Sequence, residues 1–572
     1  MLRNYYETDY IHTLRDLLER SEKKYGLDFA YKELDPERNL HSYTFVQLRE
    51  DVDALGTSLL ERGLLGKHFA IVGENSYSYV VSYMAVSMGL GVIVPLDKEL
   101  SKEELLKLIC KSDAEVLLYS ELLSDDVEEL KGSCPEVRTF INISMYGTKM
   151  GSISILDLLQ EGRSLINSGD RRYKTLPIDR NKMAAILFTS GTTGVHKGVM
   201  LSHKNILTVI HSAFSMFRFS KVSFSVLPIN HTYEFNLHVL GCLYGGITLC
   251  FNDSIKHVKD NLMIFQPGMT LMVPMIVESL YKNIWKEAEK NNLTKHLQYG
   301  IWFSNLIRKV GIDQRKLFFK PIMESLGGNL QTIVCGGAPL RPDIVKGFED
   351  IGISVYNGYG ITECAPLIAT NCTMKNIAGS VGVVIPDNLV RIADTDEDGI
   401  GEIQVQGDNV MMGYYKDPVS TRKTFTADGW FKTGDLGYLD RKGALYITGR
   451  EKNLIILANG KNVHPEELEE YILDHLAYVK EVVVYAPLSP EGNEVMIMAE
   501  AYVEDQFLIE KGVDEAKKIL KEDISKLNHK LSVYKRIHDV ELRECEFEKT
   551  STKKIKRYCI EREALSHVKY HH

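Results

Sequence analysis

Apolar residues along the first 180 positions follow two spacings. Segments 43–62 and 101–110 place them at helical intervals, and the second begins at Ser101 with two glutamates in its first turn. Short apolar runs predict buried strands at 68–72, 91–94 and 115–119. Strands that alternate with helices favour a doubly wound, mostly parallel sheet. We therefore predict an α/β fold.

A different texture begins near residue 380, where short β segments and tight turns replace this alternation. Aspartate and glycine mark hairpin turns at 396–399, 428–429 and 440–443. Beyond Arg450, the pattern predicts a helix at 465–475, a strand at 479–485 and a long helix at 513–531. We predict a large N-terminal domain of doubly wound sheets with a small β-rich subdomain (1–449), a hinge (450–453) and a small mobile α+β C-terminal domain (454–572).

Composition narrows the class of protein. The chain of 572 residues is 44% hydrophobic and 25% charged, which is typical of globular proteins. Its net charge of −9 disfavours a general nucleic-acid binder. Nine cysteines without a CxxC motif favour reduced thiols and a cytoplasmic location. Segment 80–96 is the best membrane-span candidate, but its serines, glycines and Pro95 favour a buried helix followed by a strand.

The strongest chemical signal is the segment 189–198, rich in glycine and hydroxyl groups, which follows an apolar run at 184–188. Backbone N–H groups and hydroxyls of such a loop can donate to phosphate oxygens, and Lys197 adds a positive charge. Because Gly198 follows Lys197, the segment lacks the ending of a Walker A loop. The candidate phosphate ligands are Thr189, Ser190, Gly191, Thr192, Thr193, Gly194 and Lys197.

This segment resembles the phosphate loop of the adenylate-forming superfamily, which includes acyl-CoA synthetases, nonribosomal peptide adenylation domains and firefly luciferase. His196 stands where that family usually has proline. Other family motifs follow in the family's order, so the resemblance covers nearly the whole chain. The loop at 458–467 and the ending at 548–557 look most like those of bacterial long-chain fatty-acid–CoA ligases.

The resemblance implies a nucleotide site built from several motifs. Gly336, Gly337 and Ala338 would form the turn against adenine, followed by Asn357, Gly358, Tyr359 and Gly360, with Tyr359 stacking on the base. Thr362 would meet the α-phosphate, and Glu363 would hold Mg²⁺. Asp435 would accept hydrogen bonds from the ribose hydroxyls, and Arg450 would reach the ribose or phosphate. His231, within segment 227–235, would flank the substrate carboxylate.

The C-terminal motifs imply a moving catalytic lysine. Lys452 would be the hinge, and Gly460 and Lys461 belong to the loop that swings in on the coenzyme A side. Segment 548–557 resembles the family's PKTSSGKIxR, which makes Lys554 the residue that bridges the acyl carboxylate and the α-phosphate. Glu548 and Lys553 replace the proline and glycine of that pattern, and the adjacent Lys553 leaves open which ammonium reaches the site.

The implied function is ATP-dependent activation of a carboxylic acid, a medium- or long-chain fatty acid, to acyl-AMP. Transfer to coenzyme A would then give acyl-CoA, AMP and pyrophosphate. ATP, Mg²⁺ and coenzyme A are the implied cofactors. The implied partners are small molecules, with no nucleic acid and at most transient membrane contact. Rotation of the C-terminal domain at the hinge would serve both steps at one site.

Alternatives remain within and outside this reaction. A loader that charges an acyl carrier protein shares the first step, as do an aryl or short-chain acid–CoA ligase and a luciferase-like oxygenase. A catalytically dead scaffold is the alternative outside enzymes. The presence together of Lys197, Glu363, Asp435, Arg450 and Lys554 argues against that scaffold.

Overall fold

The computed structural model describes residues 6–146, 152–189, 196–457, 461–487, 496–550, 554–557 and 559–560. Its contacts divide the chain into two units. Unit 1 comprises Met1–Thr189, His196–Leu389 and Val405–Phe431, and unit 2 comprises Ser190–Val195, Val390–Gln404 and Lys432–His572. This division is made by contacts alone, so the hinge at 450–453 and the domain limits on either side of it stay a prediction.

The first sheet of unit 1 confirms the predicted alternation. Its eight strands follow the order β19 (Gly413–Tyr414), β9 (Lys197–Ser202), β8 (Met183–Thr189), β4 (Val92–Leu96), β3 (His68–Val72), β5 (Val116–Tyr119), β6 (Thr139–Asn142) and β7 (Ile153–Ser154). The strands from β8 to β7 are parallel, whereas β9 and β19 pair antiparallel at one edge. The strands predicted at 68–72, 91–94 and 115–119 are therefore its centre.

The helices of this part of unit 1 are α1 (Leu14–Tyr25), α2 (Phe45–Glu61), α3 (Tyr77–Ser87), α4 (Lys102–Lys111), α5 (Ser124–Leu130) and α6 (Ile155–Asn167). All of them except α5 begin after a serine or threonine whose side chain caps the helix. Ser101 caps α4 in a reciprocal capping box with Glu104, as the early glutamates suggested. The segment at 80–96 lies in α3 and β4, both largely buried. Within the described ranges, no helix combines the length and hydropathy needed to cross a bilayer.

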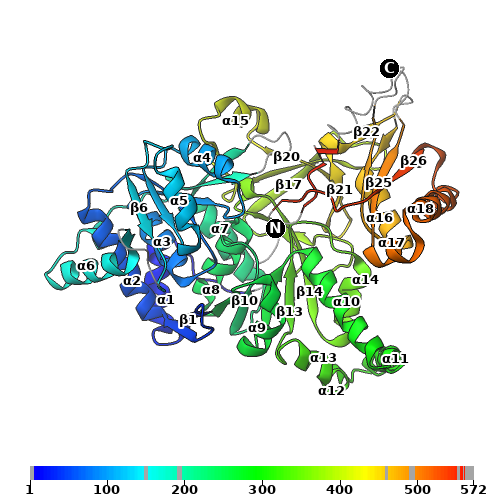
Figure 1. The fold of residues 1–572 in the computed structure, drawn as a ribbon, viewed down its shortest axis with the longest axis horizontal. Helices are drawn as coiled ribbons and strands as arrows, with labels where there is room; N and C mark the ends of the chain where they lie inside the picture. Colours follow the sequence, from blue (N-terminus) through cyan, green and yellow to red (C-terminus); the bar gives the residue numbers. More distant parts are fainter. Residues whose placement is uncertain are drawn as a thin grey trace. The chain divides into compact units, whose positions relative to one another are not determined.

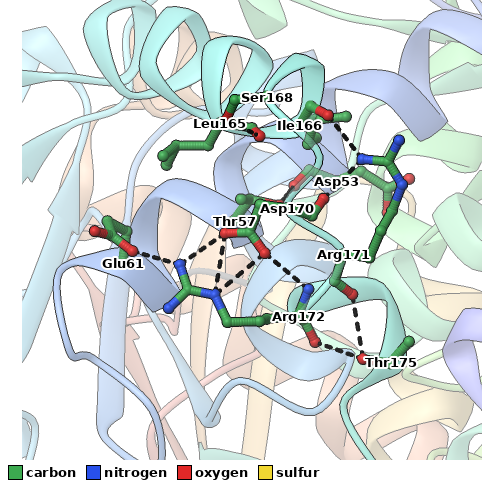
Figure 2. Close-up of polar contacts among 10 residues, drawn as sticks. All are labelled: Asp53, Thr57, Glu61, Leu165, Ile166, Ser168, Asp170, Arg171, Arg172 and Thr175. Carbon is green, nitrogen blue, oxygen red and sulfur yellow. Dashed lines mark hydrogen bonds and ion pairs between the residues drawn. The ribbon is translucent and has the colours of Figure 1, made fainter.

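A polar network joins the end of α6 to α2 (Figure 2). Arg172 forms ion pairs with Glu61 on α2 and with Asp170, which lies 2.7 Å away. Arg171 donates to the carbonyl of Ile166 at 2.7 Å. Gly162 of α6 faces the backbone of α2 so closely that a Cβ atom would overlap the chain there. Backbone contact and charge pairing therefore fix these two helices together.

The second sheet of unit 1 is also parallel at its centre (Figure 1). Its nine strands follow the order β16 (Val383–Val384), β15 (Leu367–Thr370), β14 (Ser354–Gly360), β13 (Thr332–Cys335), β12 (Met269–Met272), β10 (Val222–Ser225), β11 (Thr248–Phe251), β1 (Phe29–Leu34) and β2 (Leu40–Thr44). Strands β14 to β1 are parallel, and β2, β15 and β16 add antiparallel edges.

The remaining helices of unit 1 follow β9 in the chain. They are α7 (His203–Met216), α8 (Leu240–Gly245), α9 (Val258–Phe265), α10 (Pro274–Lys290), α11 (Thr294–Arg308), α12 (Arg315–Phe318), α13 (Lys320–Ser325), α14 (Pro342–Ile351) and α15 (Pro418–Thr424). One apolar core joins α10 and α14 to the second sheet through Val277, Phe348 and Ile333. In Figure 1, α11, α12 and α13 form a peripheral group beyond α10.

Unit 2 has the predicted short strands and the α+β texture. Its sheets are β17 (Asn388–Ala393), β18 (Gly401–Gly407), β20 (Phe431–Leu439) and β21 (Leu445–Arg450); β22 (Ile455–Ile456) and β23 (Asn462–Val463); and β24 (Val479–Tyr485), β25 (Met498–Val503) and β26 (Asp539–Arg543). Single strands are divided between the units, since residues 388–389 of β17, 405–407 of β18 and 431 of β20 are assigned to unit 1. Helices α16 (Pro465–His475), α17 (Asp505–Lys511) and α18 (Val513–Asn528) complete the unit. The helix at 465–475 and the strand at 479–485 match their predicted bounds.

Candidate active site

The hairpin of β8 and β9 holds the two ends of the candidate phosphate loop. Thr189 and Lys197 are paired across the hairpin. The ammonium of Lys111, from the last turn of α4, donates to the carbonyl of His196 at 2.6 Å. Ser190, Gly191, Thr192, Thr193 and Gly194 lie outside the described residues.

A tyrosine connects Lys197 to Glu363. The ammonium of Lys197 lies 4.8 Å from the ring centroid of Tyr414, on the neighbouring strand β19. The hydroxyl of Tyr414 donates to Oε1 of Glu363 at 2.9 Å. Burial and the adjacent Glu363 charge raise the pKa of Tyr414, so the hydroxyl keeps its proton. The structure thus brings together two predicted site residues from distant parts of the sequence.

The turn that carries Thr362 and Glu363 is held by backbone contacts. It is a short 3₁₀ helix, η5 (Thr362–Cys364), that follows β14. The amide of Met411 donates to the Glu363 carbonyl at 2.8 Å. The buried Asn409 side chain donates to the carbonyls of Cys364 and Leu367 at 3.0 and 2.8 Å. The segment before β19 therefore fixes the orientation of this turn.

The surroundings of Glu363 fit a cation that is held jointly with phosphates. Mg²⁺ prefers oxygen ligands and is usually bound by one or two carboxylates together with substrate phosphate oxygens. Within the described residues, Glu363 belongs to no group of three metal-binding side chains. A single carboxylate, oriented by Tyr414, is the donor that such shared coordination requires.

The candidate adenine residues lie at the carboxyl ends of two parallel strands. Strands β13 and β14 pair side by side, with Cys335 opposite Asn357. Gly336 follows Cys335 and packs against the ring of Tyr233, whose hydroxyl donates to the Val334 carbonyl at 3.0 Å. The exposed Gly337 and Ala338 come next in this turn. Ligands of parallel sheets bind at such strand ends.

Strand β14 presents both backbone and side-chain groups. Gly358, Tyr359 and Gly360 are all partly exposed. A Cβ atom at Gly360 would overlap the carbonyl of Pro366, so this position requires glycine. Among the residues that the structure describes, no donor reaches the buried Oδ1 of Asn357. A buried acceptor without a donor is costly, which marks Asn357 as a candidate ligand contact.

The segment before His231 is held by two hydrogen bonds to the side chain of Asn75. Asn75, just after β3, donates to the carbonyl of Leu227 at 2.7 Å and accepts from the amide of Ile229 at 3.0 Å. His231 Nε2 lies 4.0 Å from Oδ2 of Asp97, with about a third of the histidine side chain exposed. The chain continues into a π-helix, Tyr233–Val239. This arrangement holds a partly exposed imidazole beside a carboxylate.

In unit 2, the candidate ribose residues form an ion pair whose charges act on the candidate catalytic lysine. Arg450 Nε lies 2.9 Å from Oδ1 of Asp435, whose side chain is 5% exposed. The charges of both residues act on Lys554, which is 104 positions beyond Arg450. Lys554 is an exposed residue as a whole. Protein atoms around its ammonium nevertheless displace part of the water that would hydrate this group. Desolvation, followed by the Arg450 charge, lowers the pKa of Lys554, and the Asp435 charge opposes this shift.

The neighbouring lysines differ in their surroundings. Lys549 forms ion pairs with Glu481 and, at 2.8 Å, with Glu546. The amide of Thr550 donates to the Lys554 carbonyl at 2.8 Å. Lys553 lies outside the described residues.

The predicted hinge and coenzyme A loop also lie in unit 2. Lys452 is the middle residue of a short 3₁₀ helix, η6 (Glu451–Asn453). The Asn453 side chain donates to Glu466 at 2.6 Å, which ties this turn to the start of α16. The ammonium of Lys461 lies 4.3 Å from the ring centroid of Tyr534. Gly460 lies outside the described residues.

Two residues of the site were missed by sequence reasoning, namely Asn75 and Tyr414. Asn75 follows the strand at 68–72 closely, which is the signal that could have found it, because polar residues at strand ends often line sites. Tyr414 lies 217 positions beyond Lys197, and no local pattern marks its contact.

Comparisons with known proteins identify the family of the chain. A family model described as "AMP-binding enzyme" matches residues 18–415. The long-chain-fatty-acid–CoA ligase FadD15 of Mycobacterium bovis is 30% identical over 465 residues, covering 77% of this chain and 75% of that protein. A chloroplastic long-chain-fatty-acid–[acyl-carrier-protein] ligase of Arabidopsis thaliana is 28% identical over 533 residues, covering 80% and 72%.

A solved structure shows the same fold over nearly its full length. The anthranilate CoA ligase AuaEII, in complex with anthranoyl-AMP, superposes with a TM-score of 0.76 at 19% identity and covers 99% of both chains. The family model spans well over half of the sequence, and its range includes Lys197, Glu363 and Tyr414. The chain therefore belongs to the AMP-binding enzyme family, that of the adenylate-forming enzymes.

Proposed function

We propose that the chain activates a medium- or long-chain fatty acid with ATP and transfers the acyl group to coenzyme A. The family membership and the names of its relatives support this reaction. The observation that supports it most is that the charges of Asp435 and Arg450, which form an ion pair, both act on the pKa of Lys554. A cation near the carboxylate that we propose to bind the ribose would stabilise negative charge at the adjacent α-phosphate.

In the first step, a carboxylate oxygen attacks the α-phosphorus, and pyrophosphate leaves. Negative charge builds on the phosphate oxygens, so the protein's task is positioning and charge neutralisation. Lys554 would bridge the acyl carboxylate and the α-phosphate, and Thr362 would contact the α-phosphate. Lys197 and the loop at 189–194 would hold the β- and γ-phosphates. Mg²⁺ held by Glu363 would neutralise phosphate charge.

Several candidate residues would orient the nucleotide. The acceptor Oδ1 of Asn357 matches the exocyclic amine of adenine, and Tyr359 offers a ring for stacking. Asp435 would accept from the ribose hydroxyls, since a nearly buried carboxylate can take two such donors. Arg450, already paired with Asp435, would hold that carboxylate in place.

In the second step, the thiol of coenzyme A attacks the acyl carbon of the mixed anhydride, and AMP leaves. We propose that rotation at Lys452 withdraws Lys554 and brings in the loop with Gly460 and Lys461. His231 would flank the acyl carboxylate during the first step. The cysteine pattern favours the cytoplasm as the place of this reaction.

The names of the relatives differ in the molecule that accepts the acyl group. The Arabidopsis relative is named for an acyl carrier protein, so a carrier is the second candidate acceptor. Purified enzyme with ATP, Mg²⁺ and palmitate is given either coenzyme A or a holo carrier protein, and thioesters are quantified. We expect palmitoyl-CoA at a rate that exceeds carrier loading. Thioester formation only on the carrier would overturn the coenzyme A proposal and leave the adenylation step standing.

A further inference from the structure

Two cysteines and a glutamate lie together at the end of α4, outside the candidate active site. Sγ of Cys110, in the last turn of α4, is 3.4 Å from Sγ of Cys134. The same Cys134 sulfur is 3.9 Å from Oε2 of Glu136. Among the described residues, these three form the one group of metal-binding side chains whose ligand atoms all lie within 4.8 Å of one another. We call them the Cys–Glu cluster.

The segments that carry the Cys–Glu cluster pack on one apolar core. Leu108 and Ile109 of α4 share this core with the buried Cys134 and with Val137. The Val137 amide donates to the Cys134 carbonyl at 3.1 Å, across the turn that contains Glu136. Figure 1 shows α4 and α5, the helix that precedes this turn, side by side. The fold therefore holds the ligand atoms close together before any ion binds.

The separations fit a divalent cation that prefers sulfur. Zn²⁺ binds thiolate sulfur at about 2.3 Å and carboxylate oxygen at about 2.0–2.2 Å in tetrahedral geometry. Such a tetrahedron places two sulfur atoms about 3.8 Å apart and sulfur and oxygen about 3.6 Å apart. The observed 3.4 Å and 3.9 Å differ from these values by less than half an ångström. Glu136 is exposed, so its carboxylate can move the remaining distance toward Cys110.

We propose that Cys110, Cys134 and Glu136 bind one Zn²⁺, with water as the fourth ligand. Three protein ligands and a water are a common set in zinc sites that keep an open position. Mg²⁺ and Ca²⁺ fit less well, because they prefer oxygen ligands throughout. The two thiol protons leave to solvent as the ion binds. Burial raises the pKa of Cys134, and a bound cation opposes this effect because it attracts the thiolate.

The Cys–Glu cluster adjoins a contact of the candidate phosphate loop. Lys111 follows Cys110 in the chain, and its ammonium donates to the carbonyl of His196. Zinc bound at Cys110 would fix the last turn of α4, from which Lys111 reaches this carbonyl. The inference goes beyond the proposed function, since zinc binding at the cluster requires neither ATP nor an acid.

Titration of the full chain with Zn²⁺ tests the cluster in the absence of ATP, Mg²⁺ and coenzyme A. The protein is first stripped with a chelator and kept with a phosphine reductant, so that the thiols are free. We expect one tightly bound Zn²⁺ per chain. Its affinity should fall at least about a hundredfold in Cys110→Ser and at least about tenfold in Glu136→Gln, since loss of an outer partner alone weakens metal sites about 10–100-fold. Both positions are exposed, so these variants should fold.

Co²⁺ in place of Zn²⁺ reports the ligands directly. Bound at the cluster, it should show thiolate-to-metal charge transfer and the strong visible absorption of a tetrahedral site. Both signals should be lost in Cys110→Ser. Bound Co²⁺ without thiolate charge transfer would contradict the assigned ligands.

Matched variants at other exposed positions serve as controls. Cys545→Ser removes an exposed thiol outside the cluster, and Glu103→Gln removes an exposed carboxylate in the first turn of α4. Both should bind Zn²⁺ like the wild type. Equal affinity of Cys110→Ser and the wild type would overturn the proposal, as would the absence of wild-type binding. A Cys110–Cys134 disulfide that persists under the reductant would also overturn it and would identify the pair as a crosslink.

Discussion

The hydroxyl of Tyr414 donates a hydrogen bond to Glu363, and the ring of the same tyrosine lies beneath the Lys197 ammonium. One side chain thus contacts both the candidate metal ligand and the candidate phosphate-binding lysine. Strand β19, which supplies it, is hydrogen-bonded to the strand that leaves the phosphate loop. Lys197 and the Glu363 turn are therefore held in a fixed relationship within unit 1.

Tyr414→Phe tests this relationship, because it removes the hydroxyl and keeps the ring. Hydrogen bonds to charged groups contribute about 1.5–3 kcal/mol, so we expect kcat/KM for adenylation to fall about ten- to hundredfold. The apparent affinity for Mg²⁺ should fall with it. Tyr415→Phe is the matched control, since that hydroxyl donates to Asp113 at 2.6 Å. Equal losses in both variants would show that the Glu363 contact has no special role.

Lys554→Ala separates the two half-reactions. Adenylation should be lost, because no other group of the proposal neutralises charge at the acyl carboxylate. Thioester formation from supplied acyl-adenylate should continue near the wild-type rate. Lys556→Ala, a nearby lysine 3.9 Å from Glu548, is the control and should retain both steps. Parallel loss of both steps in Lys554→Ala would contradict the assigned role.

The lowered pKa of Lys554 predicts a shift in the pH profile. The reaction needs the charged ammonium, which is lost as the pH rises through the pKa of this group. Because that pKa lies below the ordinary lysine value, kcat/KM for adenylation should decline at a lower pH than an ordinary lysine would cause. Lys554→Arg stays charged throughout and should show no such decline. An unchanged alkaline limb in Lys554→Arg would assign the titration to another group.

His203 predicts a loss of stability in mild acid. It is buried, its Nδ1 accepts from the Leu14 amide at 3.1 Å, and burial lowers its pKa to about 4. Between that value and the unfolded pKa of about 6.5, the unfolded chain binds more protons than the folded one. The free energy of unfolding should therefore fall by about 3 kcal/mol as the pH drops through this window.

Urea unfolding at a series of pH values measures this loss. His203→Gln keeps a hydrogen-bonding side chain but cannot titrate, so its stability should change less with pH. His296→Gln, at an exposed histidine, should follow the wild type. A pH dependence that is the same in all three proteins would exclude His203 as its source.

Local sequence patterns predicted those elements whose residues carry the whole signal themselves. The strand at 68–72 and the helix at 465–475 have their predicted bounds, because side-chain periodicity and a proline start define them locally. The motifs around Lys197 and Glu363 were likewise evident, since each depends on adjacent residues.

Contacts between distant segments were not predictable in the same way. No sequence pattern pairs Tyr414 with Glu363, or Asn75 with the segment at 227–229, because only the packing of strands brings them together. Cys110 and Cys134 showed no motif spacing, yet their sulfur atoms lie 3.4 Å apart.

The central claim is tested most directly by acid-dependent exchange of pyrophosphate into ATP, across straight-chain acids from acetate to oleate and a set of benzoates. Exchange reports the adenylation step alone and needs no acceptor thiol. We predict exchange that rises with chain length and is absent in Lys554→Ala. Exchange that is greatest with benzoates, or no exchange with any straight-chain acid, would contradict the account.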